Sequence, residues 1–212
     1  MADLTALQQI AGRLERGDID NAQFLELFAR FMAGHIGCSR AGVWIFIDDA
    51  HGRTLRCVAM YDARTDRMVH CDDLSNATVG AYFAALESEG SINAPDALAH
   101  PALSGFADSY LRPLDVRSVL EVCFSVNGQV FGVFSCEQVG EPAVWTQRQL
   151  QALRQIGSRA SLSLMHSVST SVDTAPGALW EQSNSSRLAT TMAMPIDGPV
   201  PGPGAGTGHK PE

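Results

Sequence analysis

The clearest hydrophobic pattern lies in residues 118–137, where two apolar runs rich in β-branched and aromatic residues flank Asn127-Gly128. An Asn-Gly pair between such runs is typical of a type I′ hairpin turn, because both central residues must tolerate a positive φ. The pattern therefore predicts a β-hairpin, and its two-residue loop would place Val122 opposite Val133.

This register sorts the hairpin side chains into two faces, because successive residues of a strand point to opposite sides. One face is almost pure hydrocarbon and is expected to pack against helices: Leu120, Val122, Phe124, Val126, Phe131 and Val133. The other face mixes polar and apolar groups: Val119, Glu121, Cys123, Ser125, Val130, Gly132, Phe134 and Cys136. This mixed face could line a cavity or lie at a solvated edge, and the pattern leaves both possibilities open.

Three segments have the spacing of amphipathic helices. The first covers residues 4–16, and the second begins at Asp20, which forms a variant capping box with Gln23. The third begins at Thr146, which forms a capping box with Gln149, and it continues to about residue 167. These helices are expected to cover the hydrocarbon face of the hairpin.

Between the second and third helices, residues 41–48 and 53–61 are predicted to form two antiparallel strands. A polar, irregular crossover follows, with short helices predicted at 81–86 and 106–111 and a brief strand at 91–93. The chain should thus contain a few long helices and strands and one irregular connection between them.

Composition and charge exclude several classes of protein. The chain of 212 residues is 45% hydrophobic and 18% charged, and no apolar run approaches the length of about 18 residues that a membrane span needs. The net charge of -8 opposes non-specific binding to nucleic acid. The N-terminus lacks the pattern of a secretory signal, so we expect a cytoplasmic location and contact with neither nucleic acid nor membrane.

The composition changes near the C-terminus, where Ser, Thr, Pro and Gly predominate. Such a segment cannot bury enough apolar surface to offset its loss of conformational entropy, so residues 169–212 are predicted to be a disordered tail. The expected organisation is an N-terminal helix in 1–19, one domain in 20–168 and this tail.

Five cysteines, with no Cys-x-x-Cys spacing, fit reduced thiols better than a disulfide framework. The predicted register separates Cys123 and Cys136 by roughly 13 Å, too far for a disulfide. The run from His70 to Asp73 holds metal-competent atoms, but adjacent residues of a strand point to opposite faces. We therefore expect neither a metal site nor a cofactor.

Candidate binding residues lie in the crossover, because loops between strands often carry function. They are Asp96, His100, Tyr110 and Arg112. Each also has a structural interpretation, in which Asp96 caps a turn and Tyr110 seals an edge of the core. Trp44 and Phe46 share one face of the first strand, either as core residues or as a platform for a ligand.

The chain resembles the GAF domain, a small-molecule sensing module of bacterial signalling proteins, over about residues 20–165. The matching residues run in order through the crossover and the hairpin: Asp96-Ala97, His100-Pro101, Phe106, Tyr110-Leu111, residues 118–122, Gly128, Gly132-Val133, Cys136-Glu137, Gly140 and Trp145-Thr146. The sequence departs from the usual pattern at Cys123, where proline is common, and at Gln138, where histidine is frequent.

The resemblance implies an α+β fold, with an antiparallel sheet of about six strands. Helices from the chain ends would cover one face, and the crossover would roof a ligand cavity on the other. Carried over to this sequence, the ligand-binding residues would be Trp44, Phe46, Asp96, His100, Tyr110, Glu121 and Cys123.

Several activities known within the family lack their residues here. Residues 72–122 contain no cysteine, whereas the free methionine sulfoxide reductases need at least one in the crossover. His100 is followed by Pro101 and not accompanied by a cysteine, which argues against covalent attachment of a bilin. The Asn-Lys-x-x-Phe signature of cyclic-nucleotide binders is not found.

These observations favour a non-enzymatic sensor that binds a small ligand or responds to redox state. It would signal through its terminal helices to a protein partner in trans, and a homodimer is expected. Two alternatives stay open. One is a redox enzyme using Cys123 or Cys136 beside Glu121, although a neighbouring carboxylate would raise the pKa of a thiol. The other is an interaction scaffold with a filled cavity.

Overall fold

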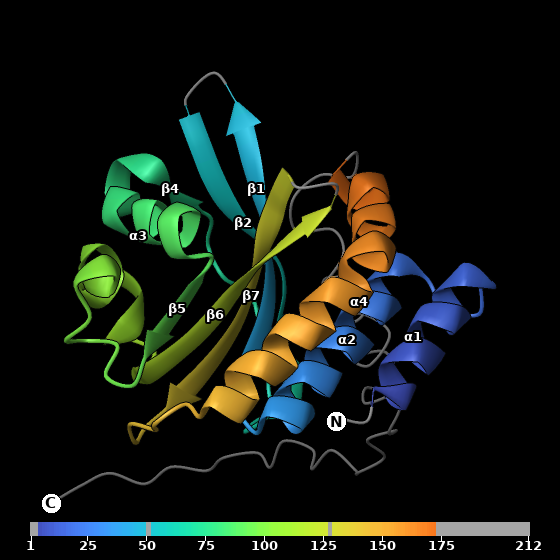
Figure 1. Cartoon of the computed structure of the whole chain (residues 1–212), viewed down its shortest axis with the longest axis horizontal. Helices are drawn as coiled ribbons and strands as arrows, with labels where there is room; N and C mark the ends of the chain where they lie inside the picture. Colours follow the sequence, from blue (N-terminus) through green and yellow to red (C-terminus); the bar gives the residue numbers. More distant parts are fainter. Residues whose placement is uncertain (1–3, 50–51, 127–128, 173–212) are drawn as a thin grey trace, which may run out of the picture.

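The computed structural model describes residues 4–49, 52–126 and 129–172. One antiparallel sheet runs in the order β3-β2-β1-β7-β6-β5, and a short strand β4 also pairs with β2 (Figure 1). The strands are β1 (Arg40–Asp49), β2 (Gly52–Asp62), β3 (Arg67–Met68), β4 (Leu74–Ser75), β5 (Ser91–Ala94), β6 (Val116–Val126) and β7 (Gln129–Val139). The predicted turn at Asn127-Gly128 and the part of the predicted tail beyond Val172 lie outside the described residues, whereas residues 169–172 of that tail belong to helix α4.

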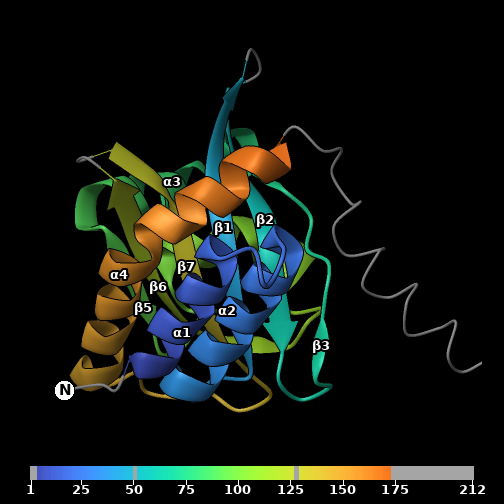
Figure 2. The same ribbon diagram turned by 90° about the vertical axis from the view of Figure 1, so that its right-hand side faces the viewer.

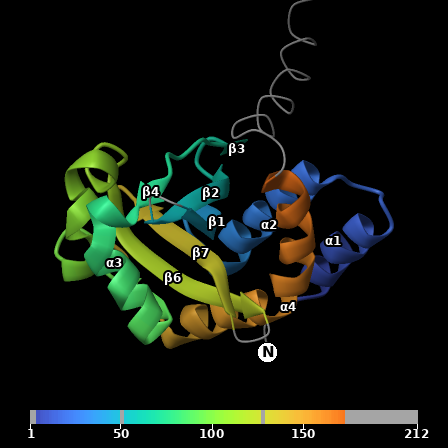
Figure 3. The same cartoon turned by 90° about the horizontal axis from the view of Figure 1, so that it is seen from above.

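Helices cover both faces of this sheet. The terminal helices α1 (Thr5–Glu15), α2 (Asn21–Ile36) and α4 (Gln147–Val172) lie together on one face (Figure 2). Helix α3 (Asn76–Glu89), a 3-10 helix η1 (Pro101–Phe106) and a π-helical turn η2 (Ala107–Leu111) lie on the other (Figure 3). The predicted α+β architecture with terminal helices on one face is confirmed.

The two capping boxes form as predicted. Asp20 accepts a hydrogen bond from the Gln23 backbone, and the Gln23 side chain accepts one from the Asp20 backbone. Thr146 and Gln149 make the same reciprocal pair before α4. These local interactions satisfy amide groups that a helix start leaves without partners, and so they fix where both helices begin.

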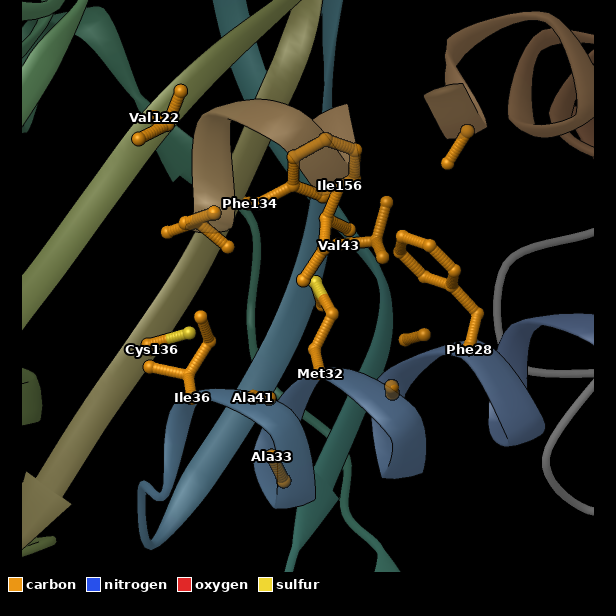
Figure 4. Packing of buried hydrophobic residues seen from close by; sticks show 14 of the residues in the cluster. Phe28, Met32, Ala33, Ile36, Ala41, Val43, Val122, Phe134, Cys136 and Ile156 are labelled. Carbon is orange, nitrogen blue, oxygen red and sulfur yellow. The ribbon is translucent and has the colours of Figure 1, made fainter. Parts of the chain in front are cut away.

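The larger core lies between the sheet and the terminal helices. Phe28, Met32 and Ile36 project from α2 toward Val43 on β1 and Phe134 on β7 (Figure 4). All five side chains are buried, and the Phe28 and Phe134 rings lie 5.5 Å apart. The apolar stripe of α2 therefore anchors the terminal helices to the centre of the sheet.

The hairpin forms, but its predicted register is wrong beyond the first residues. Val126 pairs with Gln129 as predicted, whereas Phe124 pairs with Gly132 and Val122 with Phe134. A β-bulge at Phe131 adds one residue to β7, and one added residue turns every later side chain to the opposite face.

Because of this bulge, the predicted faces of β7 are wrong after Phe131. Phe134 and Cys136 belong to the core under the terminal helices, whereas Val133 belongs to the core beneath the crossover. Figure 4 shows Phe134 and Cys136 among the residues that face α2. The predicted faces of β6 are confirmed, since Leu120 and Val122 pack under the helices and Val119 under the crossover.

Gly132 permits the close approach of β1 and β7 at the bulge. An added Cβ there would lie 2.0 Å from the Trp44 carbonyl oxygen and 2.7 Å from the Phe124 ring. Since the nearer contact is with backbone, no side-chain rotation can relieve it.

The crossover is more ordered than predicted. The helix predicted at 81–86 is α3, which is longer at both ends, and the helix predicted at 106–111 is the succession of η1 and η2. The crossover packs as a second core on the sheet, in which Tyr82 and Phe106 meet edge-to-face at 5.3 Å.

Candidate ligand-binding site

A cavity of about 350 Å³ opens at the crossover face of the sheet. One wall is the linker between β3 and β4, and the other comes from η1, η2 and the residues after them. The lining residues are His70, Cys71, Asp72, Asp73, Leu74, Phe106, Ser109, Tyr110, Pro113 and Leu114. This volume and this mixture of apolar and polar groups are within the range of small-molecule sites.

A buried ion pair lies behind the cavity. Arg40 on β1 and Glu137 on β7 are cross-strand partners, and Arg40 Nη1 lies 3.2 Å from Glu137 Oε2. The Tyr110 hydroxyl donates a 2.8 Å hydrogen bond to Glu137 Oε1. Tyr110 therefore connects the cavity wall directly to the central strands of the sheet.

Cys71 joins the same network from the opposite wall. Its Sγ accepts a 3.3 Å hydrogen bond from Arg40 Nη2 and lies 3.8 Å from the Tyr110 hydroxyl. The Arg40 guanidinium also lies 5.6 Å from the centre of the Tyr110 ring. One buried cation thus holds groups from both walls of the cavity.

Burial and the ion pair act in opposite directions on these groups. Burial raises the pKa of the Glu137 carboxyl, while Arg40 and then the Tyr110 hydrogen bond oppose the shift. Burial, and next the charge of Glu137, raise the pKa of the Tyr110 phenol. Tyr110 therefore remains a neutral hydrogen-bond donor at physiological pH.

The Cys71 thiol is shifted in the other direction. A hydrogen bond with the Cys57 thiol, and after it the Arg40 charge, lower the pKa of Cys71 against the opposing effect of burial. The Cys57 pKa is raised, first by this hydrogen bond and then by burial. Cys71 is thus the member of the pair that ionises more readily.

Among the proposed ligand-binding residues, Tyr110 lines this cavity. Trp44 is buried in the core beneath the crossover. Phe46 packs against that core, with its ring 5.7 Å from Phe83 and the Arg53 guanidinium 5.3 Å away. These contacts fit the structural interpretation of the two β1 aromatics.

Glu121 and Cys123 lie on β6 and not at the cavity wall. Burial raises the pKa of Glu121 to about 8, and the neighbouring Tyr82 and Ser135 hydroxyls oppose the shift. Burial, and then the charge of Glu121, raise the pKa of Cys123 to about 12. Glu121 is therefore mostly protonated at pH 7, and Cys123 is a thiol.

Asp96 and His100 have local contacts in the crossover. Asp96 Oδ1 accepts hydrogen bonds from the Leu98 and Ala99 amides, at 3.1 Å and 3.3 Å, as a turn-capping residue does. His100 occupies the position before η1, and its buried Nδ1 has no hydrogen-bond partner among the described residues. Neither residue is among those that line the cavity.

The other cysteines do not have the environment of a nucleophile. The Cys38 thiol, followed by burial, raises the pKa of Cys136 in the helix-side core. All five cysteines are free. The raised pKa values of Cys123 and Cys136 do not favour the redox enzyme that used either of them.

Within the described part of the chain, no cluster of three or more His, Cys, Asp and Glu side chains is placed to hold a metal ion. Within the same residues, no helix has the length and apolar character needed to cross a membrane.

The sequence analysis did not identify Arg40 or Glu137 as residues of the site, and it considered Cys71 only as a metal ligand. One signal was present, because Arg40 and Glu137 are charged residues directly beside apolar strand runs. Finding their partnership required the pairing of β1 with β7, which no local pattern specifies.

Solved structures with this fold include GAF domains that carry bound molecules. The phycocyanobilin-bound GAF domain of a cyanobacterial phytochrome is 12% identical with a TM-score of 0.60, covering 80% of this chain and 96% of that one. The GAF domain of cyanobacteriochrome TePixJ is 21% identical with a TM-score of 0.55, covering 70% and 91%. These likenesses establish the fold.

A free methionine-R-sulfoxide reductase from Neisseria meningitidis, solved with its substrate, is 18% identical with a TM-score of 0.56, covering 78% of this chain and 89% of that one. No curated protein matches the chain. The family model for the GAF domain matches residues 20–164, which is well over half of the chain. This chain therefore belongs to the GAF domain family.

Proposed function

We propose that the chain is a sensor that binds a small molecule in the cavity between the β3–β4 linker and η2. The observation that carries the proposal is the Tyr110 hydroxyl, which belongs to the cavity wall and is hydrogen-bonded to Glu137 on β7. A ligand that moves η2 would act on this bond. Similar folds that hold phycocyanobilin or a sulfoxide substrate support a ligand-binding role.

The same strand offers a route from the cavity to the terminal helices. Glu137 faces the cavity network, while its neighbour Cys136 faces the core beneath α2. Because packed cores transmit small displacements, a shift of β7 would reach the terminal helices. We propose that these helices pass the signal to a protein partner in trans.

The remaining candidate residues are proposed as secondary ligand contacts. Glu121 and Cys123 on β6, Trp44 and Phe46 on β1, and Asp96 and His100 in the crossover would contact the ligand only if the cavity enlarged toward the sheet. We therefore rank Tyr110 ahead of them. The proposed chemistry is binding and not catalysis.

Native mass spectrometry of the full chain, purified from its own host, tests ligand binding. The wild type should retain a small molecule, and Leu114→Trp should lose it because the added ring would fill the cavity mouth. Val144→Trp is the matched control, since Val144 is exposed and is not among the lining residues. Equal retention by both variants would place the ligand elsewhere, and the absence of any retained molecule would favour a scaffold.

A further inference from the structure

Two cysteines far apart in the sequence meet behind the cavity wall. The pairs Tyr61–Met68 and Leu55–Leu74 share one register, so the linker between β3 and β4 runs alongside β2. This register places Cys71 opposite Val58, the neighbour of Cys57. A bulge interrupts the pairing of β2 with β1 there, because Val43 pairs with Ala59 and Trp44 with Cys57.

The bulge directs Cys57 toward Cys71. Val58 packs against the core under the terminal helices, whereas Cys57 packs against the core beneath the crossover, which contains Cys71. Each thiol is also the largest influence on the pKa of the other, as expected of two neighbouring sulfur atoms. Bulges commonly reorient one side chain in this way near functional sites.

The two thiols differ in access and in charge. Cys71 lines the cavity, whereas Cys57 does not. Arg40 Nη2 lies 3.3 Å from Cys71 Sγ and the Tyr110 hydroxyl oxygen 3.8 Å away, so the sulfur has a cation within hydrogen-bond distance. Glu137 is the opposing charge, but it is paired with Arg40 and bonded to Tyr110. This environment favours a thiolate at Cys71.

We propose that Cys71 is a peroxide-reactive cysteine and that Cys57 is its resolving partner, so that hydrogen peroxide entering the cavity converts the pair into a disulfide. The proposal uses the cavity as an access route. It does not depend on the proposed ligand, and it goes beyond the binding function.

The reaction has two steps. The Cys71 thiolate attacks one oxygen of hydrogen peroxide, the O–O bond breaks, and uptake of one proton gives a Cys71 sulfenic acid and water. The Cys57 sulfur then attacks the sulfenic sulfur, the S–O bond breaks, and the hydroxyl leaves with the Cys57 proton as a second water. The two sulfur atoms together lose two electrons, which the peroxide accepts.

Closure requires only local movement. The two sulfur atoms must approach to a bond length of about 2.05 Å. Cys71 lies in a linker between two strands of two residues each, which is easier to displace than the central sheet. Its movement would also displace the cavity wall and its contacts with Arg40 and Tyr110.

Peptide mapping of the full chain tests the proposal. The reduced protein is exposed to hydrogen peroxide at pH 7, its remaining thiols are blocked, and it is digested with trypsin. Arg64 and Arg67 lie between the two cysteines, so a disulfide joins two separate peptides. We expect this joined species in the wild type and its loss in both Cys57→Ser and Cys71→Ser. In Cys57→Ser, dimedone should label Cys71.

The chain contains two internal controls. Cys38 and Cys136 also interact with each other, but both are buried in the helix-side core and neither lines the cavity. Their disulfide should form much more slowly, and Cys38→Ser should leave the Cys57–Cys71 link unchanged. Given a Cys123 pKa of about 12, we expect Cys71 to be oxidised at least about tenfold faster than Cys123.

The proposal is overturned if peroxide joins Cys38 to Cys136 as fast as Cys57 to Cys71, or if dimedone fails to label Cys71 in Cys57→Ser. Both outcomes are readable even if Cys71→Ser does not fold, because the first uses the wild type and the second retains Cys71. Neither outcome bears on ligand retention, which is measured in reduced protein.

Discussion

Arg40 and Glu137 face each other across β1 and β7, and their charged groups meet at 3.2 Å with only 3% of either residue exposed. The Tyr110 hydrogen bond from η2 and the Cys71 contact from the β3–β4 linker both end on this pair. The sheet thus supplies a buried charged centre that contacts both walls of the cavity.

We expect Glu137→Leu to lower the free energy of unfolding by about 3–5 kcal/mol, because it leaves the Arg40 charge buried without its partner. Adding Arg40→Met should recover part of this loss, since removing both charges also removes their desolvation cost. Urea denaturation of the two single variants and the double variant measures this coupling. Arg16→Met, at an exposed ion pair with Asp18, should have little effect. Additive losses would contradict the coupling.

Stability should fall as the pH rises between about 4.5 and about 8, the usual and the folded-state pKa of Glu121. In this window the folded protein keeps a proton that the unfolded chain has released. The expected slope is about 1.4 kcal/mol per pH unit for this group. Denaturation of Glu121→Gln across the window should give a flatter profile than the wild type. The control Glu141→Gln, at an exposed position, should keep the wild-type slope. An unchanged slope in Glu121→Gln would show that Glu121 does not cause the pH dependence.

Gly132→Ala is expected to lower the free energy of unfolding by about 3 kcal/mol or more, because its Cβ would collide with the Trp44 carbonyl. Gly34→Ala is the matched control, since a Cβ at this exposed helical position meets nothing within 4 Å. That control should gain about 0.5–1 kcal/mol from helix propensity. Equal effects in thermal or urea unfolding would show that the bulge does not require glycine.

The terminal helices lie together on one face of the sheet, and we propose that they form the interface of a homodimer (Figure 2). Sedimentation velocity should then show a dimer at tens of micromolar that dissociates on dilution. A protein that stays monomeric at that concentration would remove the dimer from the account. It would leave the cavity unaffected.

Features fixed by neighbouring residues were predictable from the sequence. Asp20 with Gln23 and Thr146 with Gln149 define two helix starts within four residues each, and the structure has both. The Asn-Gly dipeptide predicted the pairing of β6 with β7 for the same reason. The bulge at Phe131 was missed because its cause, the approach of the Trp44 carbonyl to Gly132, comes from a different part of the chain.

The candidate site was less predictable than the fold. Arg40 and Cys71 are brought together by the β3–β4 linker, which has no hydrophobic periodicity, and Glu137 reaches them only through the pairing of β7 with β1. Tyr110 was predicted from its place in the crossover and from family resemblance, but its hydrogen bond to Glu137 was not. Contacts of this kind depend on the complete topology.

A crystal structure of the reduced protein purified from its own host would test the ligand proposal most directly. We expect electron density for a small molecule between Tyr110 and the linker that carries Cys71. A cavity filled by the protein's own side chains, or a molecule bound on the face of the terminal helices, would contradict the account.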